Sequence, residues 1–212
     1  RHLMLVKSFA LLACLFLTAC GTAGKEYASD AAMAAQDAHY FAPPPRTITL
    51  FTSINGKTGS GAHSSLLINA SEQVQFDPAG SFSHPRVPER NDVHYGMTPK
   101  MVAFYIDYHA RDSARENFYV IEQTVTVSPA VAELIKQKVE ANGAVDKAHC
   151  AESISAILRS VPGFDAISST WFPKKLSKDF DALPGVRKRI ITEATADHSH
   201  GVILTDPNNP AF

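Results

Sequence analysis

Cys150 lies in the stretch 146–158, whose pattern predicts an amphipathic helix. Asp146 can cap its first turn, because a carboxylate accepts bonds from backbone N–H groups that have no intrahelical partner. A thiol in the first turns feels the positive end of the helix dipole, which favours the thiolate, the nucleophilic form. The stretch offers either a nucleophile or an inert cysteine that fills the core. The residues at i, i+4, i+7 and i+8, which we expect to share an inward face, are Cys150, Ile154, Ile157 and Leu158.

A histidine and a polar partner are expected together on a β-hairpin. The ranges 63–69 and 73–77 read as two strands that a short turn joins. Side chains alternate between faces along a strand, so the hairpin can bring His63 to the same side as Asp77 or Gln75. The sequence does not fix the register, and both partners remain candidates, with Asp77 as our first choice and Gln75 as the second.

These residues supply the parts of one kind of chemistry. A thiolate, an imidazole that takes and returns a proton, and a polar group that orients the imidazole together allow nucleophilic attack on a carbonyl. We expect the Cys150 thiolate to form an acyl-enzyme, which then passes its acyl group to water or to another acceptor. The backbone N–H of Cys150 is the expected oxyanion donor, worth about 3 kcal/mol of barrier. We expect no cofactor.

Two short motifs resemble the circularly permuted NlpC-type branch of the papain-like superfamily, which includes relatives of lecithin retinol acyltransferase. The range 61–68 followed by 74–77 looks like the branch's histidine-containing hairpin, and 150–154 looks like its motif of Cys, a small residue, Glu and a hydrophobic helix. In this branch the histidine precedes the cysteine, as here. The resemblance implies an α+β papain-like fold, with the nucleophile helix packed on an antiparallel sheet. It also implies that Cys150 is the nucleophile, that His63 is the base, and that the third residue lies on the returning strand.

The N-terminus resembles a bacterial lipoprotein signal. Basic residues precede the apolar run 8–17, which is too short for a comfortable membrane span. The run ends in Leu-Thr-Ala-Cys-Gly at 17–21, similar to a lipobox, whose cysteine becomes lipidated. We therefore expect a lipid anchor at Cys20 and, since Gly21 is not an acidic retention residue, an outer-membrane position that faces the periplasm. The expected division of the chain is signal peptide 1–19, lipidated N-terminus and tether 20–45, and papain-like domain 46–212.

The cysteine count makes Cys150 a stronger candidate for a reactive thiol. Cys14 would leave with the signal peptide and Cys20 would be blocked by lipid, so Cys150 is the expected sole thiol of the mature protein. An unpaired thiol in an oxidising compartment is a candidate for reactivity. The envelope location favours cell-wall peptides or acyl lipids as substrates. The alternative is a non-catalytic envelope lipoprotein that uses the same frame for binding or scaffolding.

Composition excludes some other classes. A length of 212 residues suits one domain with a sizeable core, and a formal net charge of −1 gives no indication of a nucleic-acid partner. His198 and His200 could face one side of a strand, but no third ligand stands at a suitable spacing, so we expect no metal site.

The remaining expectations concern local structure. Asp107 and His109 would form a surface pair on a strand, and Trp171 would lie in the core. His84 and Asp92 would be surface groups in the long segment 81–100. The other predicted elements are a short helix within 29–38, strands 47–52, 101–108 and 117–127, helices 129–141 and 177–183, and a strand or helix at 186–193.

Overall fold

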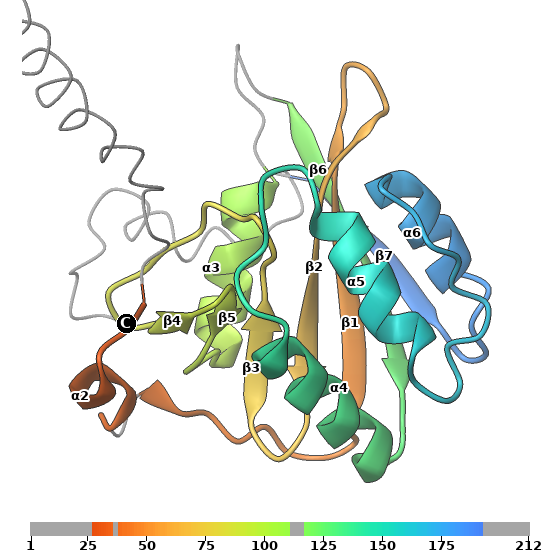
Figure 1. Ribbon diagram of the computed structural model, residues 1–212. Coiled ribbons are helices and arrows are strands. Elements are labelled where there is room, and N and C mark those ends of the chain that lie inside the picture. Colours follow the sequence, from red (N-terminus) through yellow and green to blue (C-terminus); the bar gives the residue numbers. More distant parts are fainter. Residues whose placement is uncertain (1–26, 36–37, 111–116, 193–212) are drawn as a thin grey trace, which may run out of the picture.

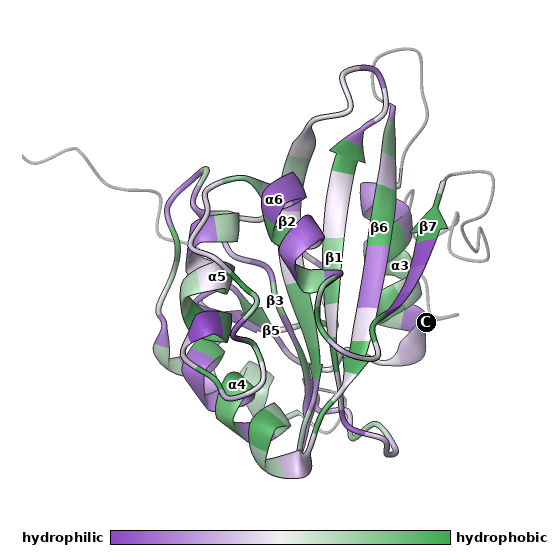
Figure 2. Ribbon diagram, turned by 90° about the vertical axis from the view of Figure 1, so that its right-hand side faces the viewer, coloured by the Kyte–Doolittle hydropathy of each residue, from purple (hydrophilic) through white to green (hydrophobic). Residues whose placement is uncertain are grey.

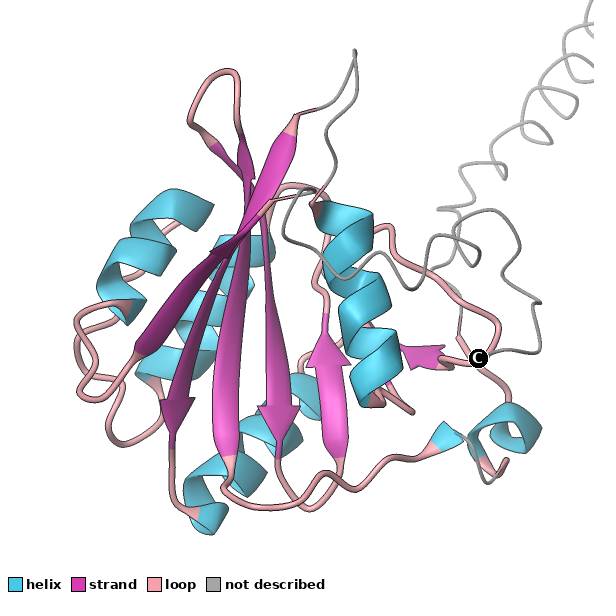
Figure 3. Cartoon of the chain, turned by 180° about the vertical axis from the view of Figure 1, so that it is seen from behind, coloured by secondary structure: helices cyan, strands magenta, loops and turns pink. Residues whose placement is uncertain are grey.

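The computed structural model describes residues 27–35, 38–110 and 117–192. The fold is α+β, as predicted: an antiparallel sheet of seven strands in the order β4-β5-β3-β2-β1-β6-β7 carries helices on both faces. Helices α4, α5 and α6 cover the face that is turned to the viewer in Figure 1, and α3 covers the opposite face, seen in Figure 3. The strands are β1 Thr47–Asn55, β2 Gly61–Asn69, β3 Gln73–Phe76, β4 Glu89–Arg90, β5 Val93–His94, β6 Phe118–Thr126 and β7 Arg187–Ile191. The helices are α2 Asp30–Met33, α3 Pro99–His109, α4 Pro129–Ala141, α5 Cys150–Arg159 and α6 Pro173–Phe180.

Two hydrophobic clusters hold these layers together. Alternate residues of the central strands, such as Ile48 and Leu66, pack under α4, α5 and α6, while Phe51 and Val120 pack under α3. Because helices cover both faces, β1 is buried along nearly its whole length. Burying each large aliphatic side chain contributes about 2 kcal/mol before the entropy cost of folding.

The edge of β2 is open at one end, and this shapes the site. Pairing between β2 and β3 runs from Asn69 opposite Gln73 to Leu66 opposite Phe76, where β3 ends. Residues 61–65 of β2 pair with β1 on one side only. Backbone N–H groups along such an edge are available to partners other than a strand.

The prediction of a strand at 101–108 is wrong, because this segment lies in α3. The Thr98 hydroxyl caps the helix by accepting from Met101 N–H, and Pro99 occupies the first turn, where a missing N–H costs nothing. The aromatic and β-branched content suggested a strand, but apolar residues at helical spacing, including Met101 and Tyr105, are buried on the α3 side of the sheet.

Several other expectations are confirmed or adjusted. Helix α4 has the predicted bounds, with Ser128 as its cap, and the described part of the ambiguous segment 186–193 contains strand β7 at Arg187–Ile191. Helix α6 begins at Pro173, four residues before its predicted start at Ser177. His84 and Asp92 are buried, contrary to the expectation of surface groups.

The described part of the expected tether packs against the domain. Tyr40 O accepts from Gln73 N–H, and His39 bonds the Glu72 carboxylate. The expected signal peptide 1–19 and Cys20 lie outside the described residues. Among the residues that are described, no helix is both long and apolar enough to cross a membrane.

Candidate active site

Cys150 is the first residue of α5, and its side chain is buried. The inward face predicted for this helix is confirmed. The predicted cap is wrong: the helix starts at Cys150, not at Asp146, and its N-cap residue, His149, makes no side-chain capping bond. Asp146 contributes its backbone carbonyl, which accepts from His149 N–H in the turn before the helix. This turn puts the sulfur at the positive end of the helix dipole.

The Cys150 sulfur is placed against the open edge of β2. Backbone N–H groups of Ser64 and Ala151 donate to the sulfur, and the His63 ring forms a hydrogen bond with it. Burial alone would raise the pKa of the Cys150 thiol, but the His63 bond and charge and the two backbone donors outweigh it and lower this pKa. The surroundings therefore favour the thiolate.

His63 connects the thiol to a carboxylate. Its Nε2 lies 2.6 Å from Oδ1 of Asp77, which leaves Nδ1 as the ring nitrogen for the thiol. The side chain of His63 is 17% exposed and that of Asp77 is 1% exposed. Burial opposes the charged ring, but the charge and hydrogen bond of Asp77, helped by Cys150, raise the pKa of His63 to about 10. A thiolate and an imidazolium thus stabilise each other.

Asp77 sits just beyond the end of β3, in a tight turn. Its backbone N–H donates to Asp92 O, and Gly80 lies so close that a Cβ there would stand 1.7 Å from Oδ2 of Asp77. Burial would raise the pKa of Asp77, but the charge and bond of His63 and the nearby His109 and His94 rings hold it well below its usual range. Asp77 is therefore a carboxylate whenever His63 is charged.

Asp92, which we expected at the surface, links the turn after Asp77 to the segment that precedes Cys150. Its carboxylate accepts from Ala79 N–H at 3.1 Å and from Val145 N–H at 2.8 Å. The first bond fixes the turn that carries Asp77, and the second fixes the segment that leads to Cys150. A short polar residue in a proline-rich loop gave no signal of this role.

Gln75, our second choice for the orienting group, does not contact His63 by a hydrogen bond. Its amide is fully buried on β3, and neither its nitrogen nor its oxygen has a hydrogen-bond partner among the described residues. The structure thus brings Cys150, His63 and Asp77 together and leaves Gln75 outside this chain of bonds.

Tyr105 belongs to the same hydrogen-bond network as Asp77, although the sequence analysis did not identify it. Its hydroxyl lies 2.6 Å from Oδ1 of Asp77 and 2.7 Å from the Ser65 hydroxyl, and all three groups are buried. Since a phenol has one proton, Tyr105 donates it to the carboxylate and accepts from Ser65. The reading of 101–108 as a strand hid this contact, although Thr98 and Pro99 were available as helix-start signals.

Replacing Tyr105 with phenylalanine should weaken the fold and shift the pH profile of the thiol. The variant keeps the ring but removes a bond to a charged acceptor, which costs about 1–3 kcal/mol. With one donor fewer, the Asp77 charge acts more fully on His63, so the imidazolium is stabilised and the pH midpoint of Cys150 alkylation should fall. Thermal unfolding and the alkylation profile measure the two effects. Tyr108→Phe is the matched control, because its hydroxyl bonds the exposed Ser81 hydroxyl at 3.3 Å and does not bond Asp77, so it should change neither; equal behaviour of the two variants would contradict the role of Tyr105.

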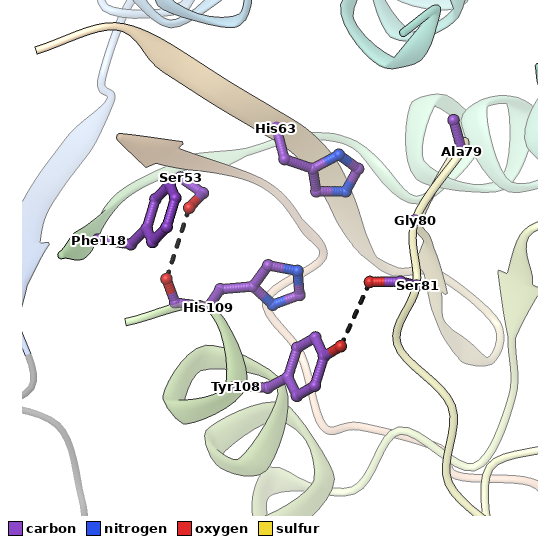
Figure 4. Close-up of a pocket in the computed structure, with 8 residues that line it drawn as sticks. All are labelled: Ser53, His63, Ala79, Gly80, Ser81, Tyr108, His109 and Phe118. Carbon is purple, nitrogen blue, oxygen red and sulfur yellow. Dashed lines mark hydrogen bonds between the residues drawn. The ribbon is translucent and has the colours of Figure 1, made fainter. Parts of the chain in front are cut away.

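A pocket of about 290 Å³ opens beside His63, and Cys150 is not among the residues that line it. Figure 4 shows the His63 and His109 rings bordering the same space, with Ser81, Tyr108 and Phe118 around it. The two imidazoles are stacked, with centroids 5.7 Å apart. His109, which we expected in a surface pair with Asp107, is therefore part of the pocket wall.

His63, Asp77 and His109 also form a group whose possible ligand atoms lie within 4.8 Å of one another. Two ligands about 2.1 Å from a tetrahedral ion stand roughly 3.3 Å or more apart. The 2.6 Å contact between His63 and Asp77 is shorter than that, so these two side chains bond each other across a proton. His198 and His200, the pair weighed in the sequence, lie outside the described residues.

Comparisons with protein-family models, with curated proteins and with solved structures find no match to this chain. The chemistry of the site thus rests on its own geometry.

Proposed function

We propose that this chain is a thiol-dependent hydrolase or acyltransferase of the permuted NlpC-type, papain-like kind, which acts on amide or ester carbonyls in the bacterial envelope. The observation that carries the proposal is the continuous chain of bonds from the Cys150 sulfur through His63 to the buried Asp77. The envelope location and the lipid anchor at Cys20 rest on the lipobox-like residues 17–21.

In the proposed reaction, the Cys150 thiolate attacks the carbonyl carbon of the substrate. The His63 imidazolium then gives its Nδ1 proton to the departing amine or alcohol, which leaves a thioester on Cys150. Water or a second acceptor loses a proton to His63 as it attacks the thioester, and the thiolate is released. Asp77 stabilises the imidazolium and keeps the ring oriented during both halves. Cys150 N–H, in the first turn of α5, has no intrahelical acceptor and is the proposed oxyanion donor.

The pocket beside His63 suits the group that exchanges a proton with this ring. Cys150 is not among the residues that line it, so it lies on the side of the base and not of the acyl carbon. Ser53, Ser81 and Tyr108 offer hydroxyl groups there, and Phe118 offers an apolar wall. We propose that the leaving group or the acceptor, an amine or alcohol of modest size, occupies this pocket.

A chromogenic short-chain ester tests the proposal. The wild-type chain should release the alcohol in a burst equal to the protein concentration, and intact mass spectrometry should detect the acyl group on Cys150. Cys150→Ser and His63→Ala should abolish the burst. His149→Ala is the matched control: this histidine is adjacent in sequence but bonds Glu152, so the burst should persist.

Two results would reject the proposal. The absence of any acyl adduct on Cys150 with esters, thioesters and peptides would favour the binding or scaffolding alternative. Hydrolysis that a chelator stops, and that Cys150→Ser leaves intact, would instead favour a metal at His63, Asp77 and His109.

A further inference from the structure

Two adjacent aromatic side chains are exposed beside the nucleophile. Trp171 is 51% exposed and Phe172 is 72% exposed, so the expectation that Trp171 lies in the core is wrong. Trp171 contacts the His149 ring, with centroids 4.3 Å apart, and His149 directly precedes Cys150. Large aromatic groups exposed side by side at the rim of a site indicate an interaction surface.

The aromatic pair is held in place by hydrogen bonds on both sides. Ser155 of α5 accepts from Thr170 N–H at 3.2 Å, which ties the preceding residue to the nucleophile helix. On the other side, the Lys174 ammonium donates to Gly59 O at 2.9 Å, at the tip of the β1–β2 hairpin. Figure 1 shows the starts of α5 and α6 beside this hairpin. The exposure of the pair therefore does not come from a loosely attached loop.

The surroundings of the pair carry exposed positive charge. Helix α6, which follows Phe172 directly, presents Lys174, Lys175 and Lys178 to solvent while burying its apolar face on the sheet. Figure 2 shows α6 largely in the hydrophilic colour. The Asp179 carboxylate pairs with Lys175, which leaves the charges of Lys174 and Lys178 uncompensated by a described ion pair.

We propose that Trp171 and Phe172, with the lysines of α6, dock this rim onto an anionic lipid bilayer. Aromatic rings lie favourably at the level of the lipid headgroups, and lysine side chains near the surface are attracted to anionic lipids. Docking brings the start of α5, with His149 and Cys150, to the bilayer surface, so the proposal deepens the proposed function by placing the substrate carbonyl at that surface.

The charge pattern favours a bilayer over a sugar as the partner of the rim. Stacking on a sugar needs one aromatic face and nearby polar groups that bond its hydroxyls. His149 and Glu152, the polar groups beside Trp171, already bond each other at 2.7 Å. Phe172 and the basic side of α6 have no role in such a complex, whereas a bilayer uses both.

The single tryptophan of the chain makes the test direct, because Trp171 is the only source of tryptophan emission. Vesicles of phosphatidylcholine with phosphatidylglycerol should shift the emission of the full chain to shorter wavelength, and vesicles of phosphatidylcholine alone should do so less. Phe172→Ser should weaken the vesicle affinity read from this shift about tenfold. Lys178→Glu should reduce the preference for the anionic vesicles. The matched control is Phe41→Ser, which removes a 69% exposed aromatic group from another part of the surface and should change nothing.

The result can be separated from that of the proposed enzyme. A lipid anchor alone would bring the chain to vesicles without changing the surroundings of Trp171, and Cys150→Ser should dock normally. An unchanged emission with both vesicle types, or equal effects of Phe172→Ser and Phe41→Ser, would overturn the docking proposal and leave the thiol chemistry untouched. A shift with soluble peptidoglycan fragments and not with vesicles would also overturn it, in favour of a sugar partner.

Discussion

Iodoacetamide should alkylate Cys150 in the folded protein at pH 6, and replacing His63 with alanine should slow this reaction about tenfold or more. An ordinary thiol with a pKa near 8.5 is well under about 1% thiolate at pH 6. In this protein the His63 bond and charge lower the pKa of Cys150. A thiolate of lower pKa is also a weaker nucleophile, which cancels about half of the advantage on a logarithmic scale and leaves about a tenfold effect.

The same experiment distinguishes the effect of the His63 charge on the thiolate from the effect of the His63 ring on access to the sulfur. Cys150 is buried, so removing the His63 ring widens the path to the sulfur and would by itself speed alkylation. A slower reaction can therefore come only from loss of the thiolate. The rate should be followed by mass spectrometry of the peptide that contains Cys150 between pH 5 and pH 9, with His149→Ala as the control that keeps the wild-type profile. If His63→Ala reacts as fast as wild type at pH 6, the imidazole does not hold the thiolate.

The hairpin that carries His63 and Asp77 could be predicted because its signals are local. Alternation with a period of two fixes which residues share a face, and a short turn fixes which strands are neighbours. The observed register, Leu66 opposite Phe76, settles what the pattern left open between Asp77 and Gln75. The register depends on how each strand packs against the helices, and no local pattern encodes it.

The contact between Cys150 and His63 could not be derived from local patterns at all. The two residues are far apart in sequence, and their contact depends on β3 ending early and on α5 starting at the open edge of β2. A resemblance to a family suggested the pair, and the geometry of this chain brings it together. The position of Asp92, which binds both halves of the site, follows from the same long-range packing.

The errors at Tyr105 and Trp171 have different physical causes. At 101–108 the strand-like composition competed with a helix-start signal at Thr98 and Pro99, and tertiary packing under the sheet favoured the helix. At Trp171 the expectation followed the general tendency of tryptophan to be buried. Helix α6 buries Leu176 and Phe180, so the two residues before its start remain outside the core.

The second large effect concerns stability. The free energy of unfolding of wild type, minus that of Cys150→Ser, should increase by about 2 kcal/mol between pH 6.5 and pH 8.5. In the serine variant, Asp77 still raises the pKa of His63 above its unfolded value of 6.5, because the charge and bond of Asp77 are larger causes than Cys150. A raised histidine pKa stabilises the fold fully below pH 6.5. That stabilisation is lost progressively as the pH rises toward the folded-state value. The free energy of unfolding of the variant should therefore fall across this range.

In wild type a second titration cancels this fall. The pKa of Cys150 is lowered by folding, so below the unfolded value of about 8.5 the unfolded chain holds a thiol proton that the folded chain lacks. If Cys150 is a thiolate in the folded state throughout pH 6.5 to pH 8.5, the folded pair holds one proton on His63 and the unfolded pair holds one on Cys150. The proton counts are then equal, and the contribution of the pair to stability is flat.

Urea unfolding of both chains in a reducing buffer, from pH 6 to pH 9, measures the difference. Groups outside the pair titrate alike in the two chains and cancel in the comparison, and His149→Ala should run parallel to wild type. Curves of wild type and Cys150→Ser that stay parallel would mean that Cys150 is a neutral thiol in the folded state. In that case the hydrogen bond between His63 and Cys150 would join two neutral groups, and the nucleophile would have to be generated only when substrate binds.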